Sequence, residues 1–183
     1  MARVRSQKGQ IAEFAPALIV FVCFILAPLV DIGILPVRYF IANGVVTEYT
    51  HTLSLAESRK KAHDMLVANS GEDYWWKDFL TNCGMTVHEP KLKLIVCGAN
   101  ASDKIELAAN QLVPEEYLPG GSKGPCVYSM DLVVDIDIPP LYNGGSSGLP
   151  GFTSPITMKF ESRSNWENLG RNPVSREFYL NEI

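Results

Sequence analysis

The hydrophobic residues of this chain are concentrated near its start. Residues 14–30 read FAPALIVFVCFILAPLV, seventeen positions without a charge, between Glu13 and Asp31. A helix of that length measures about 26 Å, close to the roughly 30 Å hydrocarbon core of a bilayer, and the flanking residues lengthen it. The pattern therefore predicts a transmembrane helix over residues 10–35.

A short basic leader precedes this apolar run. Residues 1–9 include Arg3, Arg5 and Lys8 and no acidic residue. The excess of positive charge predicts a single-pass protein with a cytoplasmic N-terminus and everything after the helix outside. A buried helix in a soluble protein is rarely apolar on every face for so long, and a cleaved secretory signal would end in a small-residue site that is absent here. A retained helix is the favoured interpretation.

Helical spacing continues beyond the apolar run. Apolar residues recur at three- and four-residue steps from Val37 to Ala56 while charged residues occupy the other faces, which predicts an amphipathic helix over residues 36–71. A second, short helix is expected over Glu72–Thr81. Its paired tryptophans, Trp75 and Trp76, are expected to close a small core rather than to lie at a membrane surface.

After Gly84 the apolar period changes from about 3.6 to 2, which is typical of strands. Three half-buried strands are predicted, over residues 92–96, 128–138 and 156–160. The long insert between the first two is expected to contain a helix over Ser102–Leu112.

Charged side chains alternate with the apolar ones on these strands. Asp131, Asp135 and Asp137 share one face of the middle strand, and the neighbouring strands offer lysines that could pair with them. The lysines are Lys91, Lys93 and Lys159. Opposite charges across strands favour an antiparallel meander with the aspartate strand in the centre. An extended strand offers no loop to wrap a cation, so a calcium site is not expected.

These elements together predict an α+β protein. A long N-terminal transmembrane and amphipathic helix would be followed by a small antiparallel sheet of three or slightly more strands. The expected organisation is a leader (1–9), a transmembrane helix (10–35), an amphipathic helix outside the membrane (36–71) and an extracytoplasmic domain (72–183).

Residues 8–15 carry a family resemblance. They read KGQIAEFA, in which a basic leader and a Gly precede Glu-Phe-Ala at the head of a long apolar helix. This segment resembles the TadE-like minor pseudopilins of tight-adherence (Tad/Flp) pilus systems, over about residues 1–40. The resemblance implies cleavage by a prepilin peptidase between Gly9 and Gln10, and assembly through Glu13 and Phe14. It also implies a bacterial inner-membrane location, with entry into a surface pilus left open.

Three of the four cysteines lie beyond the apolar run. Cys97 would end one strand and Cys126 would begin the next, so a hairpin would bring them together and a disulfide would close the long insert. The apolar alternation places the two on opposite faces unless a bulge intervenes. Cys83 with either partner is therefore an open alternative.

Composition and motifs exclude several functions. Sixteen basic against twenty acidic residues give a net charge of -4, the wrong sign for a nucleic-acid binder. No C-x-x-C occurs and His51, His63 and His88 are scattered, so neither a metal nor a cofactor is expected. Gly144–Gly148 matches G-x-S-x-G, but every histidine lies upstream and no helix can start at the following Leu-Pro-Gly, which argues against a hydrolase.

The sequence thus favours a non-catalytic, membrane-anchored component of a Tad-type pilus assembly or secretion system that acts by helix-to-helix assembly. Its expected partners are the lipid bilayer, other pilin-like subunits, the assembly platform and the prepilin peptidase, and no nucleic acid. The alternative is a membrane-tethered extracytoplasmic binding module that never enters a pilus.

Overall fold

A computed structural model describes residues 7–68, 71–100, 102–141 and 154–183, with side chains for all of these except 7–13, 24, 27, 28 and 31. The chain divides into two compact units. The first comprises Met1–Tyr39 and Ile138–Ile156, and the second comprises Phe40–Asp137 and Thr157–Ile183. Each is described separately below.

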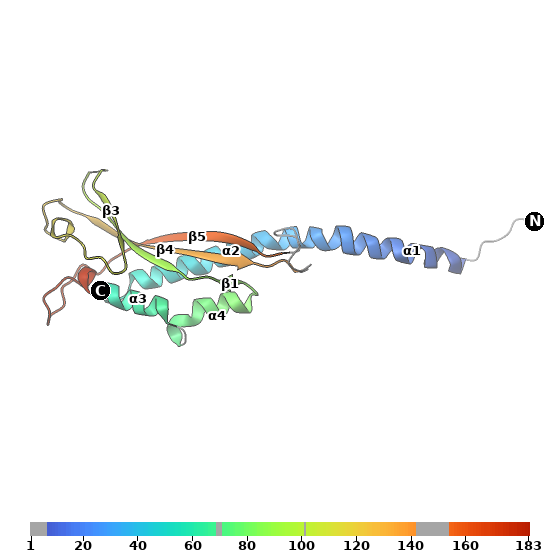
Figure 1. The fold of residues 1–183 in the computed structure, drawn as a ribbon, viewed down its shortest axis with the longest axis horizontal. Helices are drawn as coiled ribbons and strands as arrows, with labels where there is room; N and C mark the ends of the chain where they lie inside the picture. The colour runs from blue at the N-terminus through green and yellow to red at the C-terminus, as the bar shows by residue number, and fades with distance from the viewer. Residues whose placement is uncertain (1–6, 69–70, 101, 142–153) are drawn as a thin grey trace, which may run out of the picture. The chain divides into compact units, whose positions relative to one another are not determined.

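Helical backbone runs from Gln7 to Ser54 (Figure 1). Helix α1 (Gln7–Phe21) passes into a π-helical segment, η1 (Val22–Leu26), and then into α2 (Ala27–Ser54). The π-helical segment ends two residues before Pro28, which has no N–H to donate to the carbonyl group four residues earlier. The wider turn accommodates this missing donor.

The expected transmembrane helix over residues 10–35 is wrong. No helix of the described residues is long and apolar enough to cross a membrane. The apolar run is divided among three elements: α1 has 15 residues, about 22 Å of helix, and the longer α2 includes Asp31, Arg38 and Glu48. This finding also overturns the single-pass topology and the inner-membrane location inferred from the leader.

In the second unit, one stripe of α2 faces the protein interior. Ala42, Val46, Tyr49 and Leu53 have at most 1% of their surface exposed, and their spacing of four, three and four residues places them on one helix face. The helix ends at Ser54, however, rather than continuing to residue 71.

A separate helix, α3 (Arg59–Val67), follows this break. The Ser58 hydroxyl caps it by accepting a hydrogen bond from the Lys61 N–H at 3.2 Å. The amphipathic segment expected to be continuous is therefore two helices.

The short tryptophan-bearing helix lies where it was predicted. A 3-10 turn, η2 (Glu72–Tyr74), leads into α4 (Trp75–Asn82). Trp76 is fully buried and stacks on Tyr49 of α2 with ring centroids 4.8 Å apart, while Trp75 is 38% exposed. One tryptophan of the pair thus joins α4 to α2 in the core.

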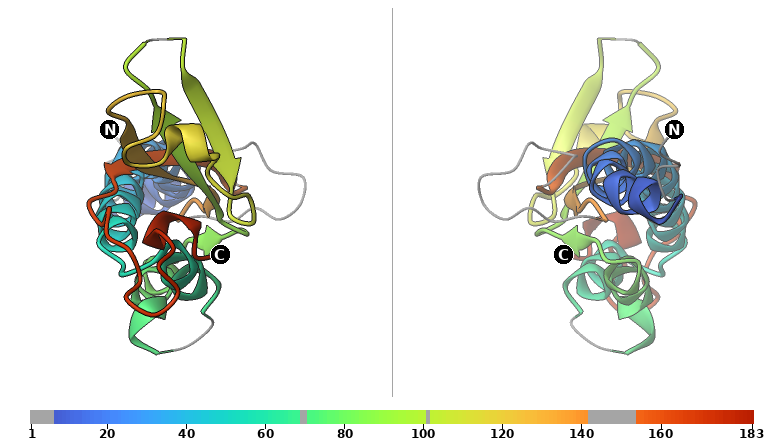
Figure 2. Two further views of the ribbon diagram at one scale, coloured as in Figure 1. Left: turned by 90° about the vertical axis from the view of Figure 1, so that its left-hand side faces the viewer. Right: turned by 90° about the vertical axis from the view of Figure 1, so that its right-hand side faces the viewer.

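Within the described part of the chain, five strands form the sheet, with β4 at its centre. They are β1 (Thr86–Val87), β2 (Lys91–Cys97), β3 (Lys104–Ala108), β4 (Val127–Ile138) and β5 (Ile156–Asn165). β4 pairs antiparallel with both β2 and β1 and pairs with β5 on its other side, while β3 extends the sheet beyond β2. Both views of Figure 2 show β3 and β5 at opposite edges.

β1 and β2 lie in one line along β4, separated by a bulge. Val87 pairs with Ile136 and Lys91 with Val133, so four steps on one strand match three on the other. Pro90 lies within this interval and has no N–H for the ladder.

The insert contains a strand rather than the predicted helix. β3 replaces the helix expected over Ser102–Leu112, and it pairs with β2 through Leu94 opposite Leu107 and Val96 opposite Ile105. A short 3-10 turn, η3 (Glu115–Tyr117), follows it.

The core of the second unit lies between the sheet and the helices. Alternate residues of β4 point into it with at most 3% of their surface exposed: Tyr128, Met130, Leu132, Val134 and Ile136. The C-terminal turn η4 (Tyr179–Asn181) closes the core with Leu180, which is fully buried. The Asn181 side chain donates to the Val113 carbonyl and accepts from the Val113 N–H, which attaches this turn to the insert.

Candidate functional site

An unusually apolar surface surrounds the helices of the first unit. We call this the N-terminal apolar surface and define it by twelve large apolar side chains between Phe14 and Val37, each 41% to 74% exposed. They are Phe14, Leu18, Ile19, Val20, Phe21, Val22, Ile25, Leu26, Leu29, Val30, Ile32 and Val37. Monomeric proteins rarely expose so many neighbouring apolar groups, and such surfaces mark sites of interaction.

The exposed residues lie on every face of the helices. Leu18, Ile19, Val20 and Phe21 are consecutive, and successive residues of an α-helix are about 100° apart. A surface helix of a globular domain would instead confine its apolar residues to one stripe, as α2 does between Ala42 and Leu53. The surface can therefore contact more than one neighbouring helix at once.

The residues assigned to processing and assembly lie at the start of this surface. Gly9, Gln10 and Glu13 are helical residues of α1, and their side chains lie outside the described part of the chain. The Phe14 side chain is described and is 74% exposed. Cleavage at Gly9 and a pairing role for Glu13 stay predictions.

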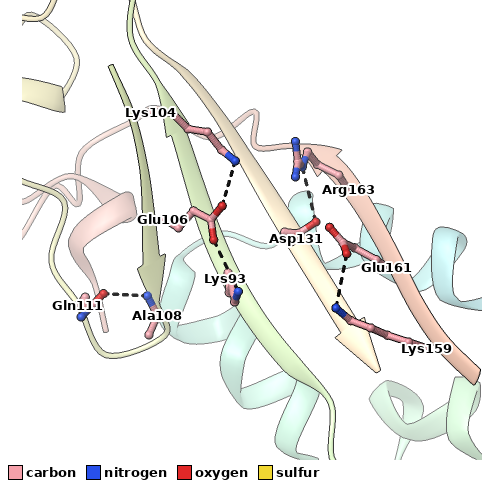
Figure 3. A network of polar contacts seen from close by, with 9 residues as sticks. All are labelled: Lys93, Lys104, Glu106, Ala108, Gln111, Asp131, Lys159, Glu161 and Arg163. Atoms are coloured by element: carbon pink, nitrogen blue, oxygen red, sulfur yellow. Dashed lines mark hydrogen bonds and ion pairs between the residues drawn. The ribbon is translucent and has the colours of Figure 1, made fainter. Parts of the chain in front are cut away.

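Charged side chains cover the outer face of the sheet (Figure 3). The aspartate strand is central, as predicted, but its partners differ from those expected. Lys93 lies opposite Asp131 in the register, yet its ammonium pairs with Glu106 of β3 at 3.6 Å. Lys159 pairs with Glu161 of its own strand at 3.8 Å. These charged side chains therefore form ion pairs within a strand or between neighbouring strands, and most of them are exposed.

Asp131 is the exception on this face because it is buried. Its carboxylate Oδ1 lies 3.5 Å from Nε of Arg163 but accepts no hydrogen bond. Burial and the nearby Glu161 raise the pKa of Asp131. The site holds a buried carboxylate beside an arginine.

At the far end of the strand, Asp137 pairs with His88 at 2.9 Å. Its carboxylate also accepts a hydrogen bond from the Thr157 hydroxyl at 2.5 Å, and these contacts lower its pKa.

The two cysteines expected to form a disulfide are neighbours in the sheet. Cys97 pairs in register with Val127, the residue after Cys126, and the thiols are not bridged in this structure. Burial raises the pKa of the Cys126 thiol, as do Asp103 and Cys97. A bridge between Cys97 and Cys126 stays a prediction, and peptide mapping of protein prepared under oxidising conditions would test it.

The described residues contain no cluster suited to a metal ion. Within residues 7–68, 71–100, 102–141 and 154–183, no three His, Cys, Asp or Glu side chains are placed to hold a metal ion. The G-x-S-x-G segment, Gly144–Gly148, lies outside the described residues.

Sequence reasoning missed one buried charge. Arg59, the first residue of α3, is 3% exposed, and its guanidinium donates to the carbonyl groups of Ala108 and Gln111. It therefore holds the end of β3 against α3. The Ser58 cap was the available local signal, because it marks where α3 begins and hence which residue enters the interior.

Comparison with known proteins gives no relative: no family model, no curated protein and no solved structure matches this chain.

Proposed function

We propose that this chain is a non-catalytic, pilin-like subunit that assembles with other subunits through its N-terminal apolar surface. The single observation that carries the proposal is the exposure of twelve large apolar side chains around α1, η1 and the start of α2. Burying one such side chain stabilises an assembly by about 1.5–3 kcal/mol. A surface of this size therefore favours contact with similar helices.

The resemblance of residues 8–15 to TadE-like minor pseudopilins supports the same function. The partners that it suggests are other pilin-like subunits, an assembly platform and a prepilin peptidase. In this proposal the helices supply the contacts between subunits, and the unit that contains the sheet is carried by them. Glu13 would neutralise the N-terminal amine of a neighbouring subunit once the chain is cut before Gln10.

Self-association of the full chain tests the proposal. Sedimentation velocity should show oligomers that Leu18→Glu and Leu29→Glu each reduce, because a carboxylate at these exposed positions would have to be desolvated in a helix contact. Val174→Glu is the matched control, since Val174 is 90% exposed and lies outside the N-terminal apolar surface. Equal oligomer content in all four proteins would refute an assembly role for this surface.

Cys23 offers an independent measurement within the same surface. It is an exposed cysteine in η1, so a short bismaleimide should join Cys23 of one subunit to Cys23 of another. Mass spectrometry of the cross-linked peptides identifies the pair. A distribution of cross-links that is unchanged in Leu18→Glu would show that the contact lies elsewhere.

A further inference from the structure

A stretch of sheet edge is left without a neighbour where β3 ends. β3 pairs with residues Lys93 to Cys97 of β2 and with nothing before them. Residues 86–92, which comprise β1, the bulge and the start of β2, pair with β4 on one side. Among the described residues, no strand pairs with their other side.

The direction of the backbone groups follows from two hydrogen bonds of β4. The Tyr128 carbonyl accepts from Trp166 N–H, beyond the end of β5, while the Asp135 carbonyl accepts from the N–H of His88. Backbone groups alternate between the two sides of a strand, so the odd-numbered residues of β4 face β2 and β1. The residues opposite even-numbered positions, Val87 and Leu92, therefore direct their N–H and C=O groups to the open side.

A groove of about 740 Å³ borders this open edge. Its other wall is formed by α3 and α4, and its apolar lining includes Leu66, Tyr74 and Leu92. The volume falls in the range of sites that bind ligands, about 300–1,000 Å³. The groove thus combines free backbone groups with an apolar wall.

The groove is also cationic. Lys77, Lys91 and Lys93 line it, and Glu89 is the one carboxylate in its lining. Of these lysines, Lys93 already pairs with Glu106 at 3.6 Å, whereas no ion pair between described residues includes Lys77 or Lys91.

Lys77 of α4 lies on the helical wall of the groove. This half-buried lysine has its Nζ 5.4 Å from the ring centroid of Tyr74 and 5.6 Å from that of Trp76, and it donates a long, 3.4 Å hydrogen bond to the Leu66 carbonyl. None of the ion pairs found between described residues includes it. Burial lowers the pKa of Lys77.

We propose that this groove binds an extended, acidic segment of a partner protein, which adds to the edge at Val87 and Leu92 in line with β3. Side chains of an extended segment alternate between faces. Carboxylates on one face would meet Lys91 and would compete with Glu106 for Lys93. On the other face, apolar side chains would lie against Leu66 and Leu92, and one carboxylate among them would reach Lys77. The bulge at Pro90 interrupts the edge between its two anchoring residues and so fixes the register of the added segment.

Binding of a synthetic peptide tests the proposal with the full chain. The probe is a fluorescein-labelled decapeptide of alternating glutamate and valine in which one central valine is replaced by glutamate, so that one carboxylate lies on the apolar face. Its binding is measured by fluorescence anisotropy. Lys77→Met should weaken binding at least about tenfold, the scale of one charge-assisted hydrogen bond. Lys77→Arg should retain binding because it keeps the positive charge, and an unchanged circular dichroism spectrum of Lys77→Met would exclude a folding defect.

Lys61→Met is the matched control. Lys61 is an exposed lysine of α3 two residues before His63, so it points away from the groove, and its removal should leave the affinity unchanged. In addition, hydrogen exchange at the amides of Val87 and Leu92 should slow when the peptide binds, since strand addition would pair them.

Four outcomes would overturn the proposal. The first is absence of binding by wild type, and the second is equal binding of a lysine-valine decapeptide. The third is displacement of the peptide by an equal concentration of free glutamate, which would indicate a site for small anions. The fourth is that the peptide dissociates oligomers of the wild type and that Lys77→Met forms no such oligomers. This result would mean that the groove is occupied by a second copy of this chain.

Discussion

Arg59 is a buried cation whose charge is met by carbonyl groups rather than by a carboxylate. Burial lowers its pKa from 12.5 to about 10. The unfolded chain therefore binds the Arg59 proton more strongly than the folded protein does. The free energy of unfolding rises with pH only once the pH passes above the folded pKa. Near neutral pH the guanidinium stays charged in both states, so its contribution there is independent of pH.

Replacing Arg59 by Met should lower the free energy of unfolding by about 2–3 kcal/mol. Two carbonyl groups would lose charged donors, and each such hydrogen bond stabilises by roughly 1.5–3 kcal/mol, offset in part because the desolvation of the cation disappears. Urea unfolding measures the effect. Lys60→Met, at the exposed neighbouring position, is the control and should change it by less than about 0.5 kcal/mol. Equal effects in the two variants would show that the contacts of Arg59 contribute nothing.

The buried carboxylate of Asp131 gives the opposite expectation, because its pKa is raised. A folded pKa above the unfolded value means that the folded state binds the proton more tightly, so wild type gains stability as pH falls through that range. Asp131→Asn removes the buried charge and leaves Arg163, which is largely solvated, unpaired.

Asp131→Asn should therefore be more stable than wild type at pH 7, by on the order of 1 kcal/mol. The difference should shrink as pH is lowered toward 3.8, the ordinary value for Asp. Thermal unfolding of both proteins from pH 7 to pH 4 measures it. A variant that loses stability at pH 7 would mean that the pairing with Arg163 outweighs the desolvation of Asp131.

At the scale of elements, α2 stabilises the second unit through its buried stripe. Leu53 is fully buried in this stripe, while Leu55, just after the helix ends, is 54% exposed. Leu53→Ala should lower the free energy of unfolding by about 2–5 kcal/mol because it leaves a cavity. Leu55→Ala should cost less than about 1 kcal/mol, and comparable losses in urea would show that the stripe is not the packing surface.

The strands were easier to predict from the sequence than the helices. In the central strand, every even position from Tyr128 to Ile138 is apolar and most of the odd positions between them are polar, which is typical of a half-covered sheet. By contrast, Lys104–Ala108 is five residues long, and its apolar positions also fit one helical face when they are extended to Leu112. Pairing with β2 decides between the two, and a single sequence contains no direct record of that pairing.

The end of α2 was missed for a different reason. No Gly or Pro lies between Ser54 and Ser58, so the amphipathic pattern runs through the break. The chain turns there because Ser58 caps the next helix and Arg59 enters the interior, and both depend on tertiary contacts. The same limit applies to the groove, whose walls come from α3, α4 and the sheet edge.

For the whole molecule, the proposed function predicts that assembly and folding depend on separate parts of the chain. Among the described residues, the buried apolar core begins at Ala42 and includes nothing from the N-terminal apolar surface. Deleting residues 1–37 should therefore leave the free energy of unfolding within about 1 kcal/mol of the full chain. In sedimentation velocity, the same deletion should abolish self-association. Loss of cooperative unfolding in the shortened protein would show that the first helices are required for the fold.

The stacked rings of Tyr49 and Trp76 allow the packing of α4 against α2 to be followed by circular dichroism. Two aromatic rings with centroids 4.8 Å apart, at an interplanar angle of 20° and both buried, absorb as a coupled chiral pair. Their near-ultraviolet circular dichroism vanishes when the helices separate, even if each helix persists. This signal distinguishes loss of tertiary packing from loss of helix without any label.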